Sequence, residues 1–402
     1  MSLHRPAGPL VGITVVEFGQ YIAVPGAAQL LSDQGADVIK IEAPGGEGAR
    51  QAAGYGAAMF ASYNRGKRMV SLDLRTDEGR RAALALALGA DVVMSNARPG
   101  AMERAGLSSA QLLAQRSDLV CLTLTGFGEQ GSMRSRPGLD IAAQAESGQM
   151  WVTGESGREP QRVGFPVVDA AATYVVAQAV TAALFEHMRN GSGADIRLSL
   201  WDVAIHMQAS NWMDYVLTGR PPVRKGNGQP SVAPAADVIE VADGHVVLSA
   251  YMDAHWRALC ALLHIEHLAD DPRLATPQIR VVHRDYMASV LSGALRHLTR
   301  QECVELLGGG GIVVGAIRSY PEVRELRGDA EGSPFLRSDA QAADAAPWYI
   351  GPPVTWGSMS PDRRAPRALG ADTDAVLAEL AAPSQPDAND SAVGAVPSLP
   401  ER

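Results

Sequence analysis

The chain has 402 residues, of which 46% are hydrophobic and 20% charged, a balance typical of a soluble globular protein with room for two domains. A formal net charge of −9 argues against a nucleic-acid-binding surface as the main function. No apolar stretch reaches the ~20 residues of a membrane span without an interrupting charge or proline. The first residues lack the apolar core of a signal peptide. We therefore expect a cytoplasmic protein that acts neither on nucleic acid nor at a membrane.

The three cysteines are far apart in the sequence and form no CxxC pair. This spacing predicts reduced, mostly buried thiols, without a disulfide framework or a zinc site. The histidines offer no metal-binding constellation either, because His264 and His267 lack a third ligand nearby. We therefore expect no metal ion.

The first third of the chain alternates short apolar segments with helical ones. Gly35 is placed to end the first helix, and Thr76 and Ser108 are placed to cap later ones. The predicted strands are residues 12–18, 37–42, 69–74, 91–95 and 119–124, and the longer predicted helices are residues 25–34 and 77–88. Such alternation predicts an α/β protein with a parallel sheet, whose ligands bind at the carboxyl ends of the strands.

The remaining sequence predicts a change of architecture. Helices are expected at residues 141–147, 169–187 and 201–215, with a strand at 196–200 between the last two. A stretch rich in Gly, Pro and basic residues follows at 218–234, and then a hairpin with its turn at Asp243 and Gly244. We expect four parts: a large α/β domain (1–220), a small α+β domain (221–325), a segment returning to the large domain (326–381) and a disordered tail (382–402).

Asp169 is the most informative single residue. From Val167 to Leu184 it is the only ionisable side chain apart from Tyr174, and the rest of the segment indicates a buried helix. Asp is among the preferred N-cap residues, so its carboxylate is suited to accept the free N–H groups of the first turn. Alternatively it is a poorly solvated carboxylate that acts as a nucleophile or base. The two roles are compatible, because a helix N-terminus stabilises an ionised carboxylate.

Several loops at the predicted sheet edge are candidate ligand sites. The turn after the first strand lacks the G-x-G-x-x-G pattern of a dinucleotide site, but a polar group could bind there at the helix N-terminus. Basic residues at 64–68 and 95–104 indicate either a phosphate grip or a solvated surface. The glycines at 308–311 are better explained by a helix end passing into a strand than by a phosphate loop.

Taken together, these segments resemble the class III coenzyme A transferases, the CaiB/BaiF-type family that also contains formyl-CoA transferases, carnitine CoA-transferases and alpha-methylacyl-CoA racemases. The resemblance runs from about Pro9 to Pro366. The segments that carry it are residues 9–18, 35–46, 64–68, 96–100, 125–128, 138–140, 144–148, 164–169 and 242–244.

The resemblance implies a Rossmann-like large domain, a smaller domain and an interlocked homodimer. It also implies an acyl-CoA:carboxylate CoA-transferase, for which coenzyme A arrives as acyl-CoA substrate and no cofactor is permanently bound. In such enzymes an aspartate attacks the acyl-CoA thioester to form an anhydride and then an aspartyl-CoA thioester. The residue that matches this nucleophile is Asp169, and Asp140 matches a position lining the thioester site. The other matched coenzyme A contacts are Ala23, Leu72, Asn96, Arg98 and Arg104, with Lys67 as a weaker match.

Two departures bear on the reaction. The racemases carry a histidine directly before the acid that matches Asp140, and here that residue is Leu139, which cannot move a proton. Some formyl-CoA transferases shield the intermediate with a run of glycines, whereas the matching segment here, residues 226–234, is not polyglycine. Transfer between an acyl-CoA and a small carboxylic acid is therefore favoured. Racemisation of a 2-methylacyl-CoA and a non-catalytic coenzyme A-binding role are the alternatives. Succinyl-CoA as donor and a branched or dicarboxylic acid as acceptor are expectations from the family.

Overall fold

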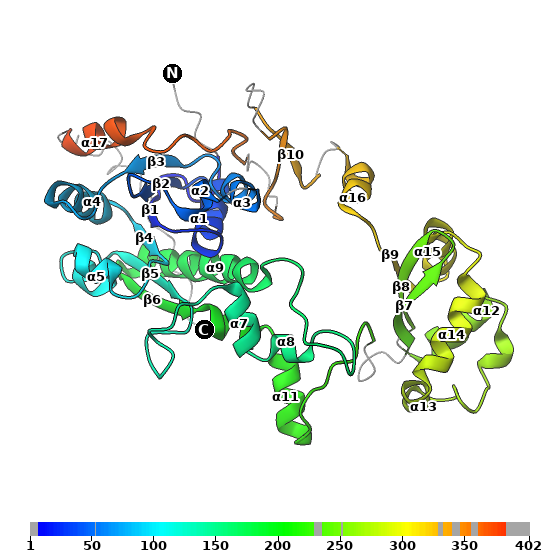
Figure 1. The fold of residues 1–402 in the computed structure, drawn as a ribbon. Coiled ribbons are helices and arrows are strands. Elements are labelled where there is room, and N and C mark those ends of the chain that lie inside the picture. The colour runs from blue at the N-terminus through cyan, green and yellow to red at the C-terminus, as the bar shows by residue number, and fades with distance from the viewer. Residues whose placement is uncertain are drawn as a thin grey trace, which may run out of the picture.

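A computed structural model describes residues 7–52, 54–228, 235–250, 252–328, 333–339, 346–354 and 361–382 of the chain (Figure 1). Its largest sheet has six strands, all parallel, in the order β3-β2-β1-β4-β5-β6. The strands are β1 (Thr14–Phe18), β2 (Asp37–Glu42), β3 (Arg68–Ser71), β4 (Val92–Ser95), β5 (Val120–Thr125) and β6 (Ala194–Ser199). The predicted α/β class with a parallel sheet is confirmed. The strand order reverses between β1 and β4, which is where ligands bind in such sheets.

Helices cover both faces of the parallel sheet (Figure 1). One face packs against α1 (Ala23–Asp33) and α9 (Val167–Asn190). The other face packs against α4 (Asp77–Gly89), α5 (Ala101–Ala105), α6 (Ser109–Leu113) and α17 (Thr373–Ala381). The strands are buried on both faces, as expected of near-continuous apolar runs in a parallel sheet.

Helix α9 is long and apolar enough to cross a membrane by length and composition. Core helices of soluble proteins pass the same test, and α9 buries eight of its residues in the core that it shares with α1. That face of α9 is packed inside the protein, whereas Tyr174, Phe185 and Met188 on the same helix are exposed.

Local sequence signals located most of these elements. The Thr76 hydroxyl accepts a hydrogen bond from the Gly79 N–H at the start of α4, and Ser108 forms a capping box at α6, as predicted. Several short helices were not predicted, among them α2 (Gly48–Gln51), α3 (Tyr55–Tyr63) and α5. The single helix predicted at 201–215 was wrong. The helix is interrupted at Met207 and Gln208, which separate α10 (Leu200–His206) from α11 (Ala209–Thr218). The side-chain amide of Gln208 donates a hydrogen bond to the Ser147 carbonyl.

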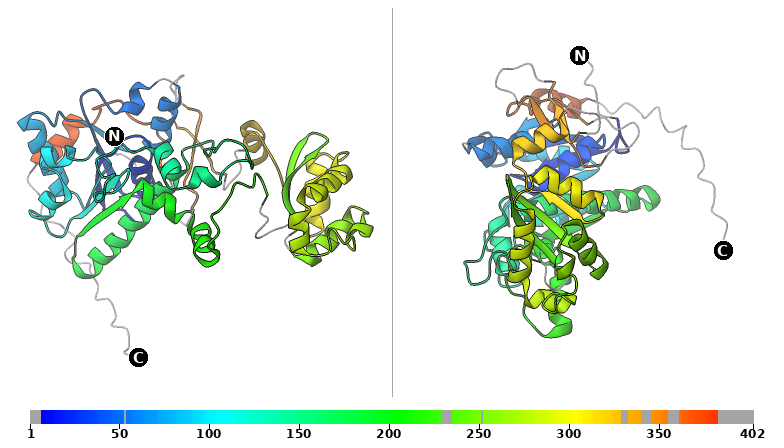
Figure 2. Two further views of the ribbon diagram at one scale, coloured as in Figure 1. Left: turned by 60° about the horizontal axis from the view of Figure 1, so that its bottom comes forward. Right: turned by 90° about the vertical axis from the view of Figure 1, so that its right-hand side faces the viewer.

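A second group of elements forms its own hydrophobic core (Figure 2). Its antiparallel sheet contains β7 (Ala235–Val241), β8 (Gly244–Ala250) and β9 (Val313–Ala316). Its helices are α12 (Asp253–Leu262), α13 (Pro277–Val282), α14 (Arg284–Leu295) and α15 (Arg300–Gly309), with a 3₁₀ turn at Glu266–Leu268. The predicted hairpin is confirmed, and the glycines at 308–311 do join a helix end to a strand.

After α16 (Tyr320–Arg327), the strands β10 (Phe335–Arg337) and β11 (Trp348–Ile350) pair, and the described chain ends beside the parallel sheet. Asp372, just before α17, accepts a hydrogen bond from the Met69 N–H at 2.9 Å, and Thr373 accepts one from the Ser71 N–H at 3.0 Å. Both bonds satisfy backbone N–H groups on the outer edge of β3. Of the predicted tail, residues 382–402, all but Ala382 lie outside the described residues.

Candidate active site

The N-termini of α1 and α9 meet at the carboxyl edge of the parallel sheet. Each helix lies on a connection between two parallel strands, α1 between β1 and β2 and α9 between β5 and β6. Each therefore begins at the edge where the preceding strand ends. The Thr173 hydroxyl lies 3.3 Å from the Ala23 carbonyl oxygen and 3.1 Å from the Asp169 carbonyl oxygen, and its single proton is shared between these two acceptors. A Cβ on Gly26 would lie only 2.7 Å from the Thr173 hydroxyl, so glycine is what allows α1 to approach α9. This contact brings Asp169 next to the turn before α1.

Asp140, and not Asp169, caps helix α9. The helix begins at Val167, so Asp169 is its third residue and the predicted N-cap role for Asp169 was wrong. Oδ1 of Asp140 accepts hydrogen bonds from the N–H groups of Val168 at 2.8 Å and Asp169 at 3.3 Å. Asp140 is the first residue of α7 (Asp140–Glu146), but its carboxyl group caps a helix that starts more than 20 residues later.

The second carboxyl oxygen of Asp140 is also occupied. Oδ2 accepts a hydrogen bond of 2.6 Å from the side-chain amide of Gln144, which is fully buried. The Gln144 amide oxygen in turn accepts one of 3.0 Å from the Val163 N–H. Asp140 is therefore held rigidly by three N–H donors, and the loop leading into α9 is tied to the same pair of side chains.

The Asp169 carboxylate is half-buried and, among the described residues, takes part in no hydrogen bond or ion pair. Burial and the negative charge of Asp140 raise its pKa from 3.8 to about 7. The expectation that the helix N-terminus would favour the ionised form is outweighed, because Asp140 takes the N–H groups that would have solvated Asp169. An unpaired, poorly solvated carboxylate with a pKa near neutrality has the properties of a nucleophile or a base.

The other matched residues lie along the same edge. Ala23 is the first residue of α1 and is buried, and Leu72 is buried directly after β3. Asn96, after β4, accepts a hydrogen bond from the Gln20 N–H and donates one to the Gln20 carbonyl, each at 2.9 Å. Arg98 and Arg104 are exposed, the first in the loop after β4 and the second in α5. The structure thus aligns these residues along one edge, with the two arginines on its solvent side.

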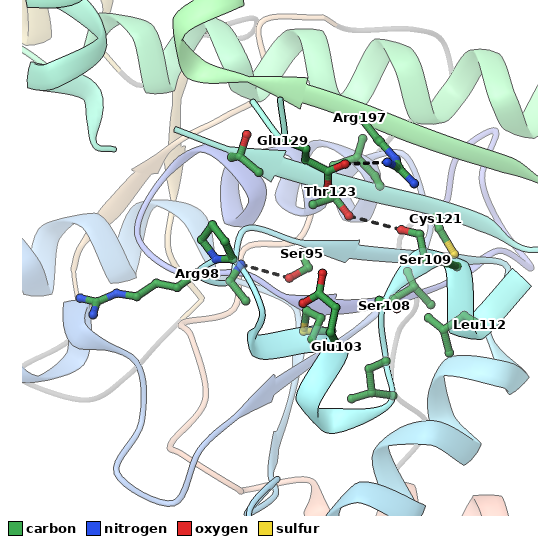
Figure 3. A pocket seen from close by; sticks show the side chains of 18 of the residues that line it. Ser95, Arg98, Glu103, Ser108, Ser109, Leu112, Cys121, Thr123, Glu129 and Arg197 are labelled. Carbon is green, nitrogen blue, oxygen red and sulfur yellow. Dashed lines mark hydrogen bonds and ion pairs between the residues drawn. The ribbon is translucent and has the colours of Figure 1, made fainter. Parts of the chain in front are cut away.

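A cavity of about 450 Å³ opens at the carboxyl ends of β4 and β5 (Figure 3). Its walls combine hydroxyl groups, among them Ser95, Ser109 and Thr123, with the apolar side chains of the α5–α6 face of the sheet. Figure 3 shows the Arg98 side chain extending away from the other labelled residues. Asp169 does not line this cavity, because it belongs to the α1–α9 face. The two features share the carboxyl edge but flank the sheet from opposite sides.

The basic segment 64–68 does not form a solvated phosphate grip. Arg65 and Lys67 are each only 1% exposed, and both are engaged in ion pairs with buried acids, Asp33 and Glu17 respectively. Neither side chain can reach a bound ligand. Lys67 as a direct coenzyme A contact is therefore wrong for this conformation.

Sequence reasoning missed a group of buried charges beneath the site, formed by Glu17, Lys40 and Glu47. Glu17 and Lys40 lie inside the strands β1 and β2, among apolar neighbours. A charged residue within a predicted buried strand needs a partner of opposite charge, and that signal was available in the sequence.

In the described part of the chain, no group of three or more His, Cys, Asp or Glu side chains could hold a metal ion.

Comparison with known proteins gives one consistent family. The model of CoA-transferase family III matches residues 10–373. A probable fatty acyl-CoA transferase, Rv3272 of Mycobacterium tuberculosis, is 36% identical over 338 residues, covering 80% of this chain and 86% of that protein. The succinate–glutarate CoA-transferase of Agrobacterium fabrum is 34% identical over 389 residues, covering 92% of this chain and 96% of its own length.

Solved structures agree with this relationship over most of the chain. A CaiB/BaiF family protein from Brucella suis superposes with a TM-score of 0.81 at 32% identity and covers 93% of this chain and all of its own. The crystal structure of Rv3272 superposes with the same TM-score at 34% identity, over 92% of this chain and 99% of that protein.

Proposed function

This chain is an enzyme that belongs to CoA-transferase family III, and from this membership we propose that it transfers CoA from an acyl-CoA donor to a carboxylic acid with Asp169 as the nucleophile. The observation that carries the proposal is the state of Asp169. Its carboxylate is half-buried, unpaired among the described residues, and has a pKa raised to about 7. A carboxylate stripped of water and hydrogen bonds is a stronger nucleophile than a solvated one.

The proposed reaction begins with attack of an Asp169 carboxylate oxygen on the thioester carbonyl carbon. The carbon–sulfur bond breaks, CoA leaves as thiolate, and an acyl–aspartyl anhydride remains. The thiolate then attacks the aspartyl carbonyl carbon, which releases the donor acid and forms an aspartyl-CoA thioester. The acceptor carboxylate attacks this thioester to form a second anhydride, and the thiolate takes the acceptor acyl group and frees Asp169.

Asp140 has two consequences for this sequence. It fixes the first turn of α9, so the direction of the Asp169 side chain is set before substrate binds. Its negative charge also raises the free energy of ionised Asp169, and acylation removes that repulsion because the aspartyl anhydride is neutral at this position. The repulsion therefore favours formation of the covalent intermediate.

The racemase alternative needs a second proton-transfer group, and the chain offers little for it. Leu139, which stands where the racemases have histidine, is 60% exposed and cannot carry a proton. Glu146 lies at the far end of α7 and pairs with Arg136. Asp140 is the remaining acid, and three N–H donors already occupy its oxygens.

We place the coenzyme A along the carboxyl edge, from the turn before α1 to the loop after β4. Asn96 and Leu72 would border the pantetheine chain, and the exposed Arg98 and Arg104 would pair with phosphates. Coenzyme A is a long molecule, so its nucleotide end and its thioester can lie on opposite sides of the edge. This arrangement is consistent with a cavity beside Arg98 that does not contain Asp169.

For the substrates we propose succinyl-CoA as a donor and a dicarboxylic acid as acceptor. Relatives are named as succinate–glutarate and succinyl-CoA:mesaconate CoA-transferases.

We also propose a cytoplasmic homodimer. Helix α11 buries none of its residues within the chain, and Trp212, Met213, Val216 and Leu217 on it are exposed. A second copy of the chain would cover such a surface.

The test is a matrix of acyl-CoA donors and carboxylic acids, followed by mass spectrometry of the CoA products. At least one pair should exchange CoA in the wild type and none in Asp169→Asn. Deuterium exchange at the alpha carbon of a 2-methylacyl-CoA, without any acid present, would support racemisation instead. Coenzyme A binding without exchange across the whole matrix would support the non-catalytic alternative.

A further inference from the structure

A charged cluster directly beneath the turn before α1 is formed by three buried side chains, Glu17, Lys40 and Lys67. Glu17 accepts from both lysines: Oε1 lies 2.9 Å from Nζ of Lys40 and Oε2 lies 2.6 Å from Nζ of Lys67. The Lys67 ammonium has two further acceptors, the Asn64 side-chain oxygen at 3.1 Å and the Pro25 carbonyl at 2.8 Å. All three protons of this ammonium are therefore used inside the protein.

The cluster binds the backbone of residues 19–25, which comprise the turn and the first residues of α1, at three points. Lys40 donates to the Gly19 carbonyl at 2.7 Å, and Glu47 accepts from the Tyr21 N–H at 2.7 Å. Lys67 holds the other end of the turn at Pro25. Glu47 is joined to the cluster through Lys40, 3.4 Å away. The buried charges thus form one continuous clamp on the segment that faces the candidate site.

The turn needs such a clamp because its backbone is strained. Tyr21 has a φ of 65°, in the left-handed region that costs a non-glycine residue about 1–2 kcal/mol. Its hydroxyl also packs so closely on Gly48 that a Cβ there would lie 2.4 Å away. Strained backbone of this kind persists only where the surroundings enforce it, and it is common at ligand sites.

We propose that Lys67 is a positioning residue of the transferase reaction: by binding Glu17, Asn64 and Pro25, it fixes residues 19–25 in the shape that receives acyl-CoA. Its burial excludes direct contact with the substrate, so its effect passes through the turn. The inference rests on the proposed function, because it assigns the turn to acyl-CoA. Burial alone would raise the pKa of Glu17, but the charges of Lys40 and Lys67 lower it and favour the ionised Glu17 carboxylate.

The experiment compares Lys67→Met with Arg65→Met in the full-length protein. Both residues are buried cations in one loop, each paired with a buried acid. Arg65 binds Asp33 and the Asp362 carbonyl, and neither contact reaches the turn. Each variant therefore removes one of the partners of a buried acid, since Glu17 keeps Lys40 and Asp33 keeps Gln29, but only Lys67→Met also releases the clamp. Calorimetric titration with coenzyme A, steady-state kinetics and thermal melting are measured for both.

Lys67→Met should weaken coenzyme A binding at least tenfold, whereas Arg65→Met should change it less than threefold at a similar loss of thermal stability. Replacing Tyr21 with glycine in the Lys67→Met background should recover part of the affinity, since glycine adopts the turn conformation without strain. If Lys67→Met does not fold, Glu47→Ala removes the Tyr21 contact from the edge of the cluster and should give the same loss of affinity.

Equal weakening in the Lys67 and Arg65 variants, or no weakening in either, would overturn the positioning role. The result also separates the two proposals. A wild-type protein that binds no coenzyme A and exchanges none would contradict the proposed function itself. A wild-type protein that binds and exchanges CoA, together with an unaffected Lys67→Met variant, would contradict only the inference about Lys67.

Discussion

Replacing the nucleophile Asp169 with asparagine should make the protein more stable at alkaline pH. Asparagine keeps the shape of the side chain and removes its charge. Burial and Asp140 raise the pKa of Asp169 from 3.8 to about 7 in the folded protein. The folded state therefore holds a proton that the unfolded state has lost, and the wild type loses stability as the pH rises from about 4 to about 7. The asparagine variant has no such loss.

The change in the free energy of unfolding depends on how much of the pKa shift of Asp169 lies between the two pH values that are compared. Between pH 5 and pH 8, about two pKa units of the shift are expressed, or ~2.7 kcal/mol at about 1.4 kcal/mol per unit. Asp169 is half-buried, so solvent screening reduces this to about 1.5 kcal/mol. The stability of Asp169→Asn relative to the wild type should therefore increase by about 1.5 kcal/mol between pH 5 and pH 8.

Urea unfolding at both pH values measures the difference, provided that the dependence on urea is the same for both proteins. Asp285→Asn is the matched control, because Asp285 is an exposed acid in the first turn of α14. Its stability relative to wild type should not change between the two pH values. A variant at Asp169 that becomes less stable than wild type as the pH rises would refute the reasoning. It would mean that the folded protein stabilises the Asp169 charge.

Three further predictions concern the neighbours of Asp169 and the surface of the chain. Asp140→Asn removes the charge that helps to raise the pKa of Asp169, so the acidic limb of kcat/KM should move to lower pH by at least about half a unit; an unchanged limb would contradict the coupling. Asn96→Ala removes both bonds to Gln20 and should raise the Kd for coenzyme A about three- to tenfold; unchanged binding would place coenzyme A elsewhere. Light scattering on the purified protein should give twice the 42.3 kDa of one chain, and a monomer would contradict the homodimer.

The parallel sheet was predictable because its signals are local. Residues 37–42 form β2 with the predicted ends, and Thr76 caps α4 through its own hydroxyl. Buried strands in a parallel sheet are short apolar runs between helices, and each can be recognised within a few residues. The rules for such connections make the strands parallel, but they leave the strand order open, and the structure supplies it.

The candidate site was less predictable because its key contacts join distant parts of the chain. The carboxyl group that caps α9 comes from Asp140, which is 28 positions before the Val168 N–H that it accepts. No sequence pattern around Asp169 shows that Asp140 caps α9 in its place. Lys67 likewise lies in a loop whose basic composition indicates either a phosphate grip or a solvated surface, but it is buried and paired with Glu17, 50 positions earlier. Local sequence identifies which residues carry chemistry, whereas their roles depend on tertiary partners.

The central claim is that Asp169 becomes covalently attached to substrate. Incubation with an active acyl-CoA donor, rapid quenching in acid and mass spectrometry of the peptide that contains Asp169 test it directly, with hydroxylamine added in a parallel sample to trap the activated aspartyl group. The account predicts a CoA adduct on Asp169 during turnover, a hydroxamate at the same residue after hydroxylamine, and neither in Asp169→Asn. Continued CoA exchange with no adduct on Asp169, or with an adduct on a different residue, would contradict it.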